Sequence, residues 1–261
     1  RGARRYTALM PWDPGQYRKF QSERFAPFDD LFALIGVRPA LRVVDLGCGT
    51  GELTARLADQ LPESDVLGID SSPEMLAQAA SLARPRLRFE RQAIEDVAGR
   101  WDVVFSHAAL QWVDDHTTLV PRLLALVAAD GQIAVQVPSN HNHESHLLIR
   151  ETAGEEPFRA ALGGWVRVAP VLPIDVYAEI LHASGAAAVT VFEKIYPHVL
   201  EDADAIADWV KGTALVPYLD RLPEHLREPF MERYRQKLRA RWPERPVFYP
   251  FRRILFCATL G

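Results

Sequence analysis

Short apolar runs alternate with stretches of helical periodicity between residues 42 and 137. Each run has the length of a buried strand, and the stretches between them place apolar residues three and four positions apart. This alternation is typical of an α/β fold, in which helices cover both faces of a parallel sheet. The predicted strands cover residues 42–46, 66–69, 87–90, 102–106 and 133–137.

Helices are predicted between these strands from apolar spacing and from helix-start signals. Leucines recur at intervals of four and predict a helix over residues 52–61. Ser72 followed by Pro73 is typical of a helix N-terminus, so another helix is expected to begin there. A third helix is predicted over residues 119–128, with its end near Gly131.

The rhythm changes after residue 140, where helical patterns become longer and strands become rarer. We interpret residues 197–246 as a helical cap inserted before the last strand of the sheet. Helices are predicted over residues 144–153, 173–184, 203–211 and 224–241, and strands over residues 188–196 and 247–259.

Composition narrows the class of protein. The 261 residues are 48% apolar and 25% charged, which excludes a disordered or fibrous chain, and no run approaches the roughly 18 apolar residues that span a membrane. A net charge of −4 makes a nucleic-acid partner less expected. Two cysteines form no disulfide framework, so we expect a cytoplasmic protein.

We further expect a monomer, with residues 1–9 as an arm or an expression remnant and one domain over residues 10–261.

A glycine-rich turn, Asp45-Leu46-Gly47-Cys48-Gly49-Thr50-Gly51, joins the first predicted strand to its helix. Glycines allow a sharp turn and leave the backbone open to a ligand, and the helix that follows presents free N–H groups. Asp70 ends the next strand, where its carboxylate can accept hydrogen bonds from both hydroxyls of a ribose. The turn and the acid together predict an adenosine-containing cofactor.

Two cofactors are compatible with this pattern. A dinucleotide site has the spacing G-x-G-x-x-G, whereas here Glu52 occupies the place of the last glycine and would repel a pyrophosphate. S-adenosylmethionine carries a sulfonium cation and no phosphate, so acids on both sides of the turn favour it. A nicotinamide-dependent oxidoreductase, or a module that senses adenosyl ligands without turnover, remains as an alternative.

The turn, together with Gly68–Met75, resembles the class I S-adenosylmethionine-dependent methyltransferases. Further segments narrow the resemblance to the trans-aconitate methyltransferases, and it extends from about Met10 to the C-terminus. These segments are Trp12–Tyr17, Glu23–Arg24, Leu110–Trp112, Ala134–Asn140, Asp208–Thr213 and Phe251–Arg253.

This resemblance implies a Rossmann-like, doubly wound, seven-stranded sheet, mostly parallel with an antiparallel last strand. It also implies methylation of one carboxylate of a small polycarboxylic acid, most plausibly trans-aconitate, with another small carboxylate as the alternative. A carboxylic acid with a pKa near 4 is ionised at neutral pH, so no catalytic general base is expected. The implied cofactor-binding residues are Tyr17, Arg24, Asp45, Gly47, Cys48, Gly49, Asp70, Ser71, Ala93, Ile94 and Ser106.

One departure from the family pattern concerns the adenine contact. Family members often carry an acid in an Ala-Asp-Ile segment after the third strand, and here Ala93 occupies that place. Gln92, Glu95 or Asp96 are the candidates to replace it.

A polycarboxylate requires local donors, and arginine matches a carboxylate in a bidentate manner. Arg252 and Arg253 are adjacent in a predicted strand, so we expect only one of them to face the site. The candidate substrate-binding residues are His107, Gln111, Trp112, Lys211, Tyr218, Arg252 and Arg253. The histidines at 141, 143 and 146 form a dense cluster, but no metal is expected.

Overall fold

A computed structural model describes the backbone of residues 22–261 and the side chains of residues 25–261. Within these residues the chain divides into two compact units. The first unit contains residues 22–138, 170–194 and 253–261, and the second contains residues 139–169 and 195–252. The predictions for residues 1–9, Gln16 and Tyr17 lie outside the described residues.

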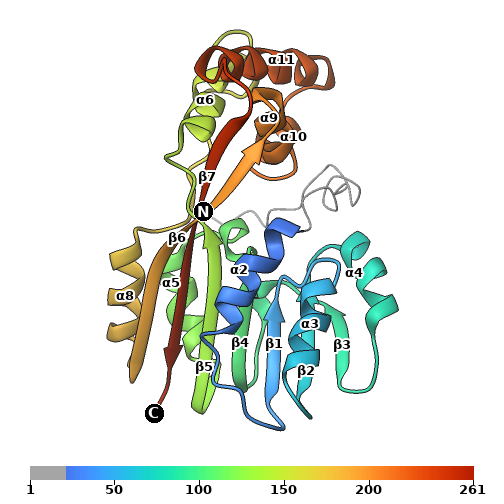
Figure 1. The fold of residues 1–261 in the computed structure, drawn as a ribbon, viewed down its shortest axis with the longest axis vertical. Coiled ribbons are helices and arrows are strands. Elements are labelled where there is room, and N and C mark those ends of the chain that lie inside the picture. Colours follow the sequence, from blue (N-terminus) through green and yellow to red (C-terminus); the bar gives the residue numbers. More distant parts are fainter. Residues whose placement is uncertain (1–21) are drawn as a thin grey trace. The chain divides into compact units, whose positions relative to one another are not determined.

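The first unit is built on a seven-stranded sheet with the order β3-β2-β1-β4-β5-β7-β6. Strands β1 to β5 pair in parallel, and β7 pairs antiparallel with β5. This topology confirms the predicted Rossmann-like sheet with its antiparallel last strand (Figure 1). The strands are β1 Arg42–Leu46, β2 Asp65–Asp70, β3 Leu87–Arg91, β4 Trp101–His107, β5 Val127–Pro138, β6 Ala188–Leu200 and β7 Val247–Thr259.

Helices cover both faces of this sheet, as expected for a doubly wound fold (Figure 1). Helices α2 and α3 lie on one face, whereas α5 and α8 lie on the other. The helices of the first unit are α2 Ser22–Phe32, α3 Glu52–Gln60, α4 Pro73–Ala79, α5 His116–Leu124 and α8 Ile174–Ala183, with short 3-10 turns at η1 Ala80–Leu82, η2 Ile94–Asp96 and η3 Leu110–Trp112.

The predicted end of the helix at residue 128 is wrong. Helix α5 ends at Leu124, and β5 already begins at Val127. The apolar run that includes both residues serves first as the end of a helix and then as the start of a strand, which periodicity alone cannot separate. Gly131 lies inside β5, where a Cβ atom would stand 2.9 Å from the carbonyl oxygens of Ala128 and Asp102.

The second unit is helical and has its own apolar core. It contains residues 139–169 in addition to the expected insertion at 197–246, and β6 and β7 each have residues in both units. The second unit is therefore broader than the cap predicted from the sequence. Its helices are α6 Glu144–Ala153, α7 Phe158–Ala161, α9 Ala203–Lys211, α10 Val216–Arg221 and α11 Glu224–Arg241.

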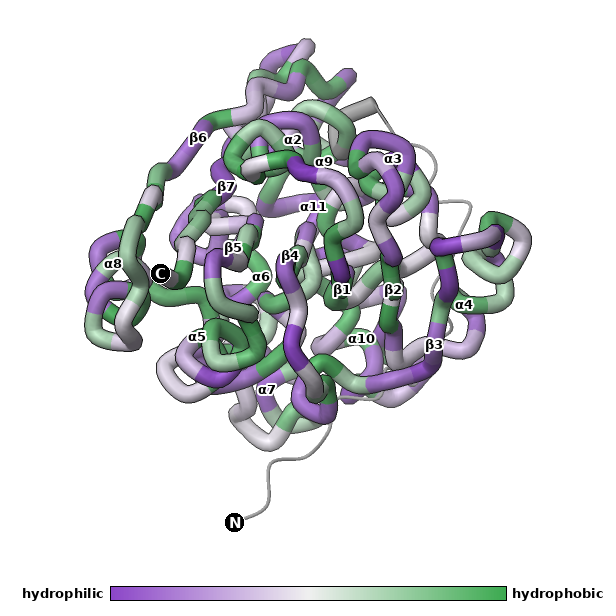
Figure 2. Tube along the Cα trace, turned by 90° about the horizontal axis from the view of Figure 1, so that it is seen from below, coloured by the Kyte–Doolittle hydropathy of each residue, from purple (hydrophilic) through white to green (hydrophobic). Residues whose placement is uncertain are grey.

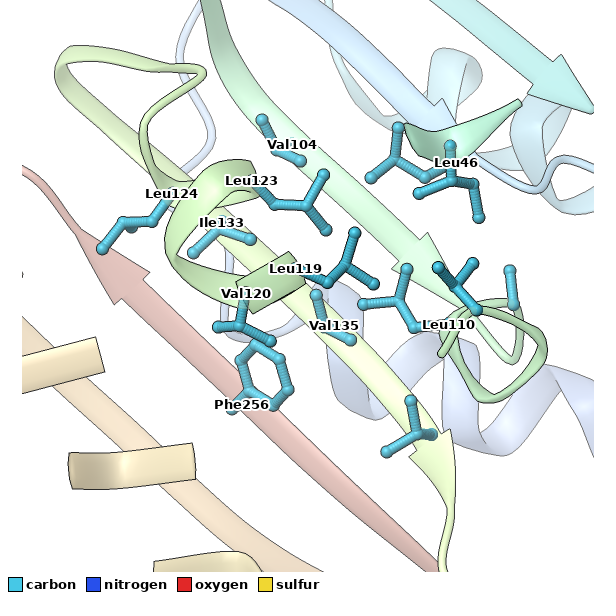
Figure 3. Close-up of a cluster of buried hydrophobic side chains, with 14 of the residues drawn as sticks. Leu46, Val104, Leu110, Leu119, Val120, Leu123, Leu124, Ile133, Val135 and Phe256 are labelled. Atoms are coloured by element: carbon cyan, nitrogen blue, oxygen red, sulfur yellow. The ribbon is translucent and has the colours of Figure 1, made fainter. Parts of the chain in front are cut away.

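The main core of the first unit lies between the sheet and helices α5 and α8. Leu123 of α5 packs here with Val135 of β5 and Phe256 of β7 (Figure 3). The apolar residues of α5 and β2 appear as green segments in Figure 2. Among the described residues, no helix combines the length and apolar character that crossing a bilayer requires.

Replacing Leu123 with alanine is predicted to lower the free energy of unfolding by about 2–5 kcal/mol, because the side chain is fully buried and its loss leaves a cavity. Val37→Ala is the control, since that side chain is 48% exposed, and it should cost less than about 0.5 kcal/mol. Urea unfolding measures both variants. Equal stabilities for the two would contradict this assignment of the core.

Candidate active site at the carboxyl ends of the strands

The glycine turn after β1 adopts backbone conformations that favour glycine. Gly47, Gly49 and Gly51 have φ angles of 78°, 56° and 77°. The amide of Gly47 donates to the carbonyl oxygen of Ile69 at 2.9 Å, which ties the turn to the end of β2. A Cβ atom on Gly47 would lie 2.3 Å from the Cβ of Ala109, so no larger residue fits there.

Asp70, the last residue of β2, is fixed beside this turn by two backbone amides. Its Oδ2 accepts from the Gly49 amide at 2.9 Å, and its Oδ1 accepts from the Ser72 amide at 2.9 Å. A carboxylate oxygen has two lone pairs, so each oxygen can accept one further hydrogen bond. Two acceptor positions therefore remain for the predicted ribose hydroxyls, and that contact stays a prediction.

Asp45, at the end of β1, is 4% exposed and accepts a hydrogen bond of 2.6 Å from the hydroxyl of Thr54. This bond joins the strand to α3 beneath the glycine turn. Burial raises the pKa of Asp45 to about 7; the Thr54 hydrogen bond opposes this shift, and the negative charge of Asp70 adds to it. The carboxyl group of Asp45 thus titrates near neutral pH in the folded chain.

Two further residues predicted to bind the cofactor, Cys48 of the turn and Ser106 of β4, are buried. Cys48 is 8% exposed, and burial, together with the charges of Asp45 and Asp70, raises the pKa of its thiol far above the usual range. A thiol that stays protonated is a poor nucleophile, and the cofactor contact of Cys48 stays a prediction. Ser106 of β4 donates to the carbonyl oxygen of Leu46 at 3.0 Å and fixes β4 beside β1.

The segment after β3 contains the predicted adenine contacts. Ala93 precedes the short turn η2, and Ile94, the first residue of that turn, is buried. The backbone amide of Gln92 donates to the carbonyl oxygen of Asp70 at 3.0 Å, and its side-chain amide donates to the carbonyl oxygen of Asp96 at 2.9 Å. The side-chain amide of Gln92 thus already donates within the turn, and its adenine contact stays a prediction. The cofactor contact of the exposed Ser71 also stays a prediction.

Three predicted substrate residues, His107, Gln111 and Trp112, lie at the end of β4 or just after it. The ring of His107 meets the ring of Phe28 edge to face at 6.2 Å. The side-chain amide of Gln111 donates to the carbonyl oxygen of Ala108 at 2.6 Å, and Trp112 ends the turn η3. All three predicted residues are half-buried, which leaves part of each side chain accessible.

Arg252 and Arg253 face opposite sides of β7, as the strand alternation predicts. Arg252 is exposed, whereas Arg253 is 5% exposed and donates to Oε1 of Gln136 at 3.1 Å. Sequence reasoning did not single out Gln136 as the partner of Arg253. The signal that could have identified it is a glutamine inside an otherwise apolar strand.

The other predicted substrate residues lie in the second unit together with Arg252. Lys211 ends α9 and is half-buried. Tyr218 is buried in the core of that unit, where its ring stacks on Phe230 at 6.0 Å and its hydroxyl accepts from the Arg167 amide at 3.2 Å. Packing therefore accounts for Tyr218, and the substrate contacts of these residues stay predictions. The side chain of Arg24 lies outside the described side chains.

The histidine cluster supports helix α6. His143 precedes the helix, accepts from the Ser145 amide at 3.2 Å, and stacks on Trp242 with 5.9 Å between ring centroids. His146 contacts the hydroxyl of Ser145 at 3.2 Å. In the part of the chain that the structure describes, no group of three histidine, cysteine, aspartate or glutamate side chains has the geometry of a metal site.

The sheet order and the glycine turn define a class I methyltransferase fold, and comparison with known structures agrees. The YcgJ protein of Bacillus subtilis superposes with a TM-score of 0.58 at 15% identity, over 92% of this chain and 98% of that protein. Phosphoethanolamine N-methyltransferase 2 of Haemonchus contortus, in complex with S-adenosyl-L-methionine, superposes with a TM-score of 0.54 at 14% identity, over 91% of this chain and 53% of the other. A family model described as a methyltransferase domain matches residues 43–131.

Sequence relatives make the assignment narrower. The trans-aconitate 2-methyltransferase of Deinococcus radiodurans is 48% identical over 96% of this chain and 98% of its own. That of Variovorax paradoxus is 39% identical over 91% of this chain and 92% of its own. The chain belongs to the trans-aconitate 2-methyltransferase family. This confirms the predicted family and enzyme class, and it displaces the alternative of a nicotinamide-dependent oxidoreductase.

The raised pKa of Asp45 predicts a pH-dependent stability. The carboxyl group titrates near pH 4 in the unfolded chain and near 7 in the folded one. Between these values the folded chain retains a proton that the unfolded chain releases, so the contribution of Asp45 to stability falls as the pH rises. Asp45→Asn removes this contribution.

The difference in free energy of unfolding, Asp45→Asn minus parent, should therefore increase between pH 5 and pH 8 by up to about 3 kcal/mol. Chemical denaturation of both proteins in the same buffers measures this difference and cancels the titration of all other groups. A difference that stays constant across this range would show that Asp45 is not held in a desolvated site.

Proposed function

We propose that the protein methylates one carboxylate of trans-aconitate with S-adenosylmethionine as the methyl donor. The observation that carries the proposal is the 48% identity to a trans-aconitate 2-methyltransferase over nearly the full length of both chains. The carboxyl-end site supports it, because Asp70 and the glycine turn form a cradle suited to an adenosine group. Family and fold both favour this donor over a pyrophosphate-containing cofactor.

S-adenosylmethionine supplies an electrophilic methyl group, and its transfer to a carboxylate oxygen gives a methyl ester and S-adenosylhomocysteine. The protein must bind the cofactor and the carboxylate substrate, orient them toward each other and exclude water from the site. Asp70 would hold the ribose, and the backbone of Gly47 and Gly49 would face the cofactor, since these two residues carry no side chain. No residue needs to act as a general base, because the acceptor is already ionised.

Orientation of the two reactants is the main source of rate. Holding reactants in line can contribute roughly 7–11 kcal/mol to lowering a barrier. Arg253 supplies a buried guanidinium at the strand ends, where a carboxylate can be bound away from water. We further propose that the enzyme acts on this small molecule as a cytoplasmic monomer without nucleic acid.

Incubating the purified protein with labelled S-adenosylmethionine and trans-aconitate should yield the monomethyl ester, detected by mass spectrometry. A panel of other small di- and tricarboxylic acids tests the alternative acceptors. No ester from trans-aconitate, in a protein that binds the cofactor by calorimetry, would reject the substrate and leave the enzyme class standing.

Two variants of β2 provide the matched control. Asp70→Ala removes the proposed ribose contact and should lower turnover at a fixed cofactor concentration by at least about tenfold. Asp65→Ala, at the other, exposed end of the same strand, should leave turnover unchanged. Equal turnover in the two variants would contradict the placement of the cofactor.

A further inference from the structure

Three polar side chains project from neighbouring strands toward the face of the sheet that α2 covers. His107 of β4 is in register with Gln136 of β5, and Arg253 of β7 is in register with Pro138, two residues further along β5. Side chains alternate along a strand, so residues two or four apart share a face. The ring of Phe28 in α2 contacts that of His107 and so identifies the face.

Two further contacts place the other residues on this same face. Gln132, four residues before Gln136, bonds to the backbone of Gly36 just after α2. Cys257, four residues after Arg253, approaches the carbonyl oxygen of Leu34 at 3.5 Å. Gln136 and Arg253 therefore lie side by side on the α2 face, at the end of the sheet where the parallel strands place their ligands.

The orientation of the Gln136 amide follows from its partner. A guanidinium group only donates hydrogen bonds, so Oε1 must face Arg253, which it does at 3.1 Å. Nε2 then points elsewhere. Gln136 is fully buried, and its Nε2 has no hydrogen-bond partner among the residues that the structure describes. A buried donor of this kind costs free energy unless an acceptor is supplied.

Gln132 is a buried glutamine with a structural role, and both polar atoms of its side-chain amide have hydrogen-bond partners. Its Oε1 accepts from the Gly36 amide at 3.0 Å, and its Nε2 donates to the Gly36 carbonyl oxygen at 3.1 Å. The two glutamines lie on the same strand and the same face, and both are buried. In Gln132 both the oxygen and the nitrogen of the amide have a hydrogen-bond partner, whereas in Gln136 the nitrogen has none among the described residues. Structural support for the sheet therefore does not account for Gln136.

We propose that Gln136 is a specificity-determining residue whose Nε2 donates to a carboxylate of the substrate, beside the guanidinium of Arg253. The inference rests on the proposed function, because it assigns the acceptor to a polycarboxylate. A carboxylate offers only acceptor atoms, which match the unpaired Nε2 donor of Gln136 and the donor groups of a guanidinium. Gln136 also holds the Arg253 guanidinium in position through its Oε1, so one side chain orients both donors.

Gln136→Glu is the sharpest variant. It preserves the shape and the oxygen that faces Arg253, but it replaces the donor with a charged acceptor. In calorimetry with saturating S-adenosylhomocysteine, the Kd for trans-aconitate should rise about 10–100-fold. The Kd for S-adenosylhomocysteine alone should stay within about twofold of the parent value. Gln136→Met removes the donor and leaves the Arg253 charge, and it should raise the trans-aconitate Kd about tenfold.

Gln132→Glu is the matched control on the same strand, and it should lower thermal stability without changing the trans-aconitate Kd. Thermal unfolding verifies that each Gln136 variant is folded. An unchanged trans-aconitate Kd in folded Gln136→Glu overturns the inference. So does a rise in both Kd values, which would assign the amide to the cofactor.

Binding and methylation assays on the parent protein distinguish a failure of this inference from a failure of the proposed function. A parent that binds and methylates trans-aconitate, with Gln136→Glu binding it equally well, contradicts the role of Gln136 alone. A parent that neither binds nor methylates trans-aconitate contradicts the proposed substrate, and this inference with it.

Discussion

The hydrogen bond from the Gly49 amide to the Asp70 carboxylate joins the two turns at which the first strands of the sheet end. Gly49 has a positive φ angle, a backbone conformation that favours glycine at this turn. A second amide, from Ser72 at the start of the next helix, holds the other carboxylate oxygen. The carboxylate of Asp70 is thus held by two backbone amides, and each of its oxygens keeps a lone pair for a further hydrogen bond.

Parallel pairing explains why the chemistry gathers at one edge of the first unit. Strands β1, β2, β4 and β5 run in the same direction, so their carboxyl ends meet at the same edge. The antiparallel β7 brings Arg253 to that edge from the opposite direction, in register with Pro138. The fold therefore places two acids, Asp45 and Asp70, at the ends of β1 and β2, and a buried guanidinium, that of Arg253, beside the end of β5.

Much of this arrangement could be predicted from the sequence, because its signals are local. The glycine turn and Asp70 are a short motif beside apolar runs, and the helices predicted at 144–153, 203–211 and 224–241 have these same bounds in the structure. The boundary between α5 and β5 could not be placed, since one apolar run belongs to both. The role of Gln136 depends on a partner 117 residues away, which no local pattern reveals.

A crystal structure of the protein with S-adenosylhomocysteine tests the central claim most directly. The account predicts both ribose hydroxyls within hydrogen-bond distance of the Asp70 carboxylate, with the Gly47–Gly49 backbone against the cofactor. Density for the cofactor at any other place, or a ribose that does not contact Asp70, would contradict it.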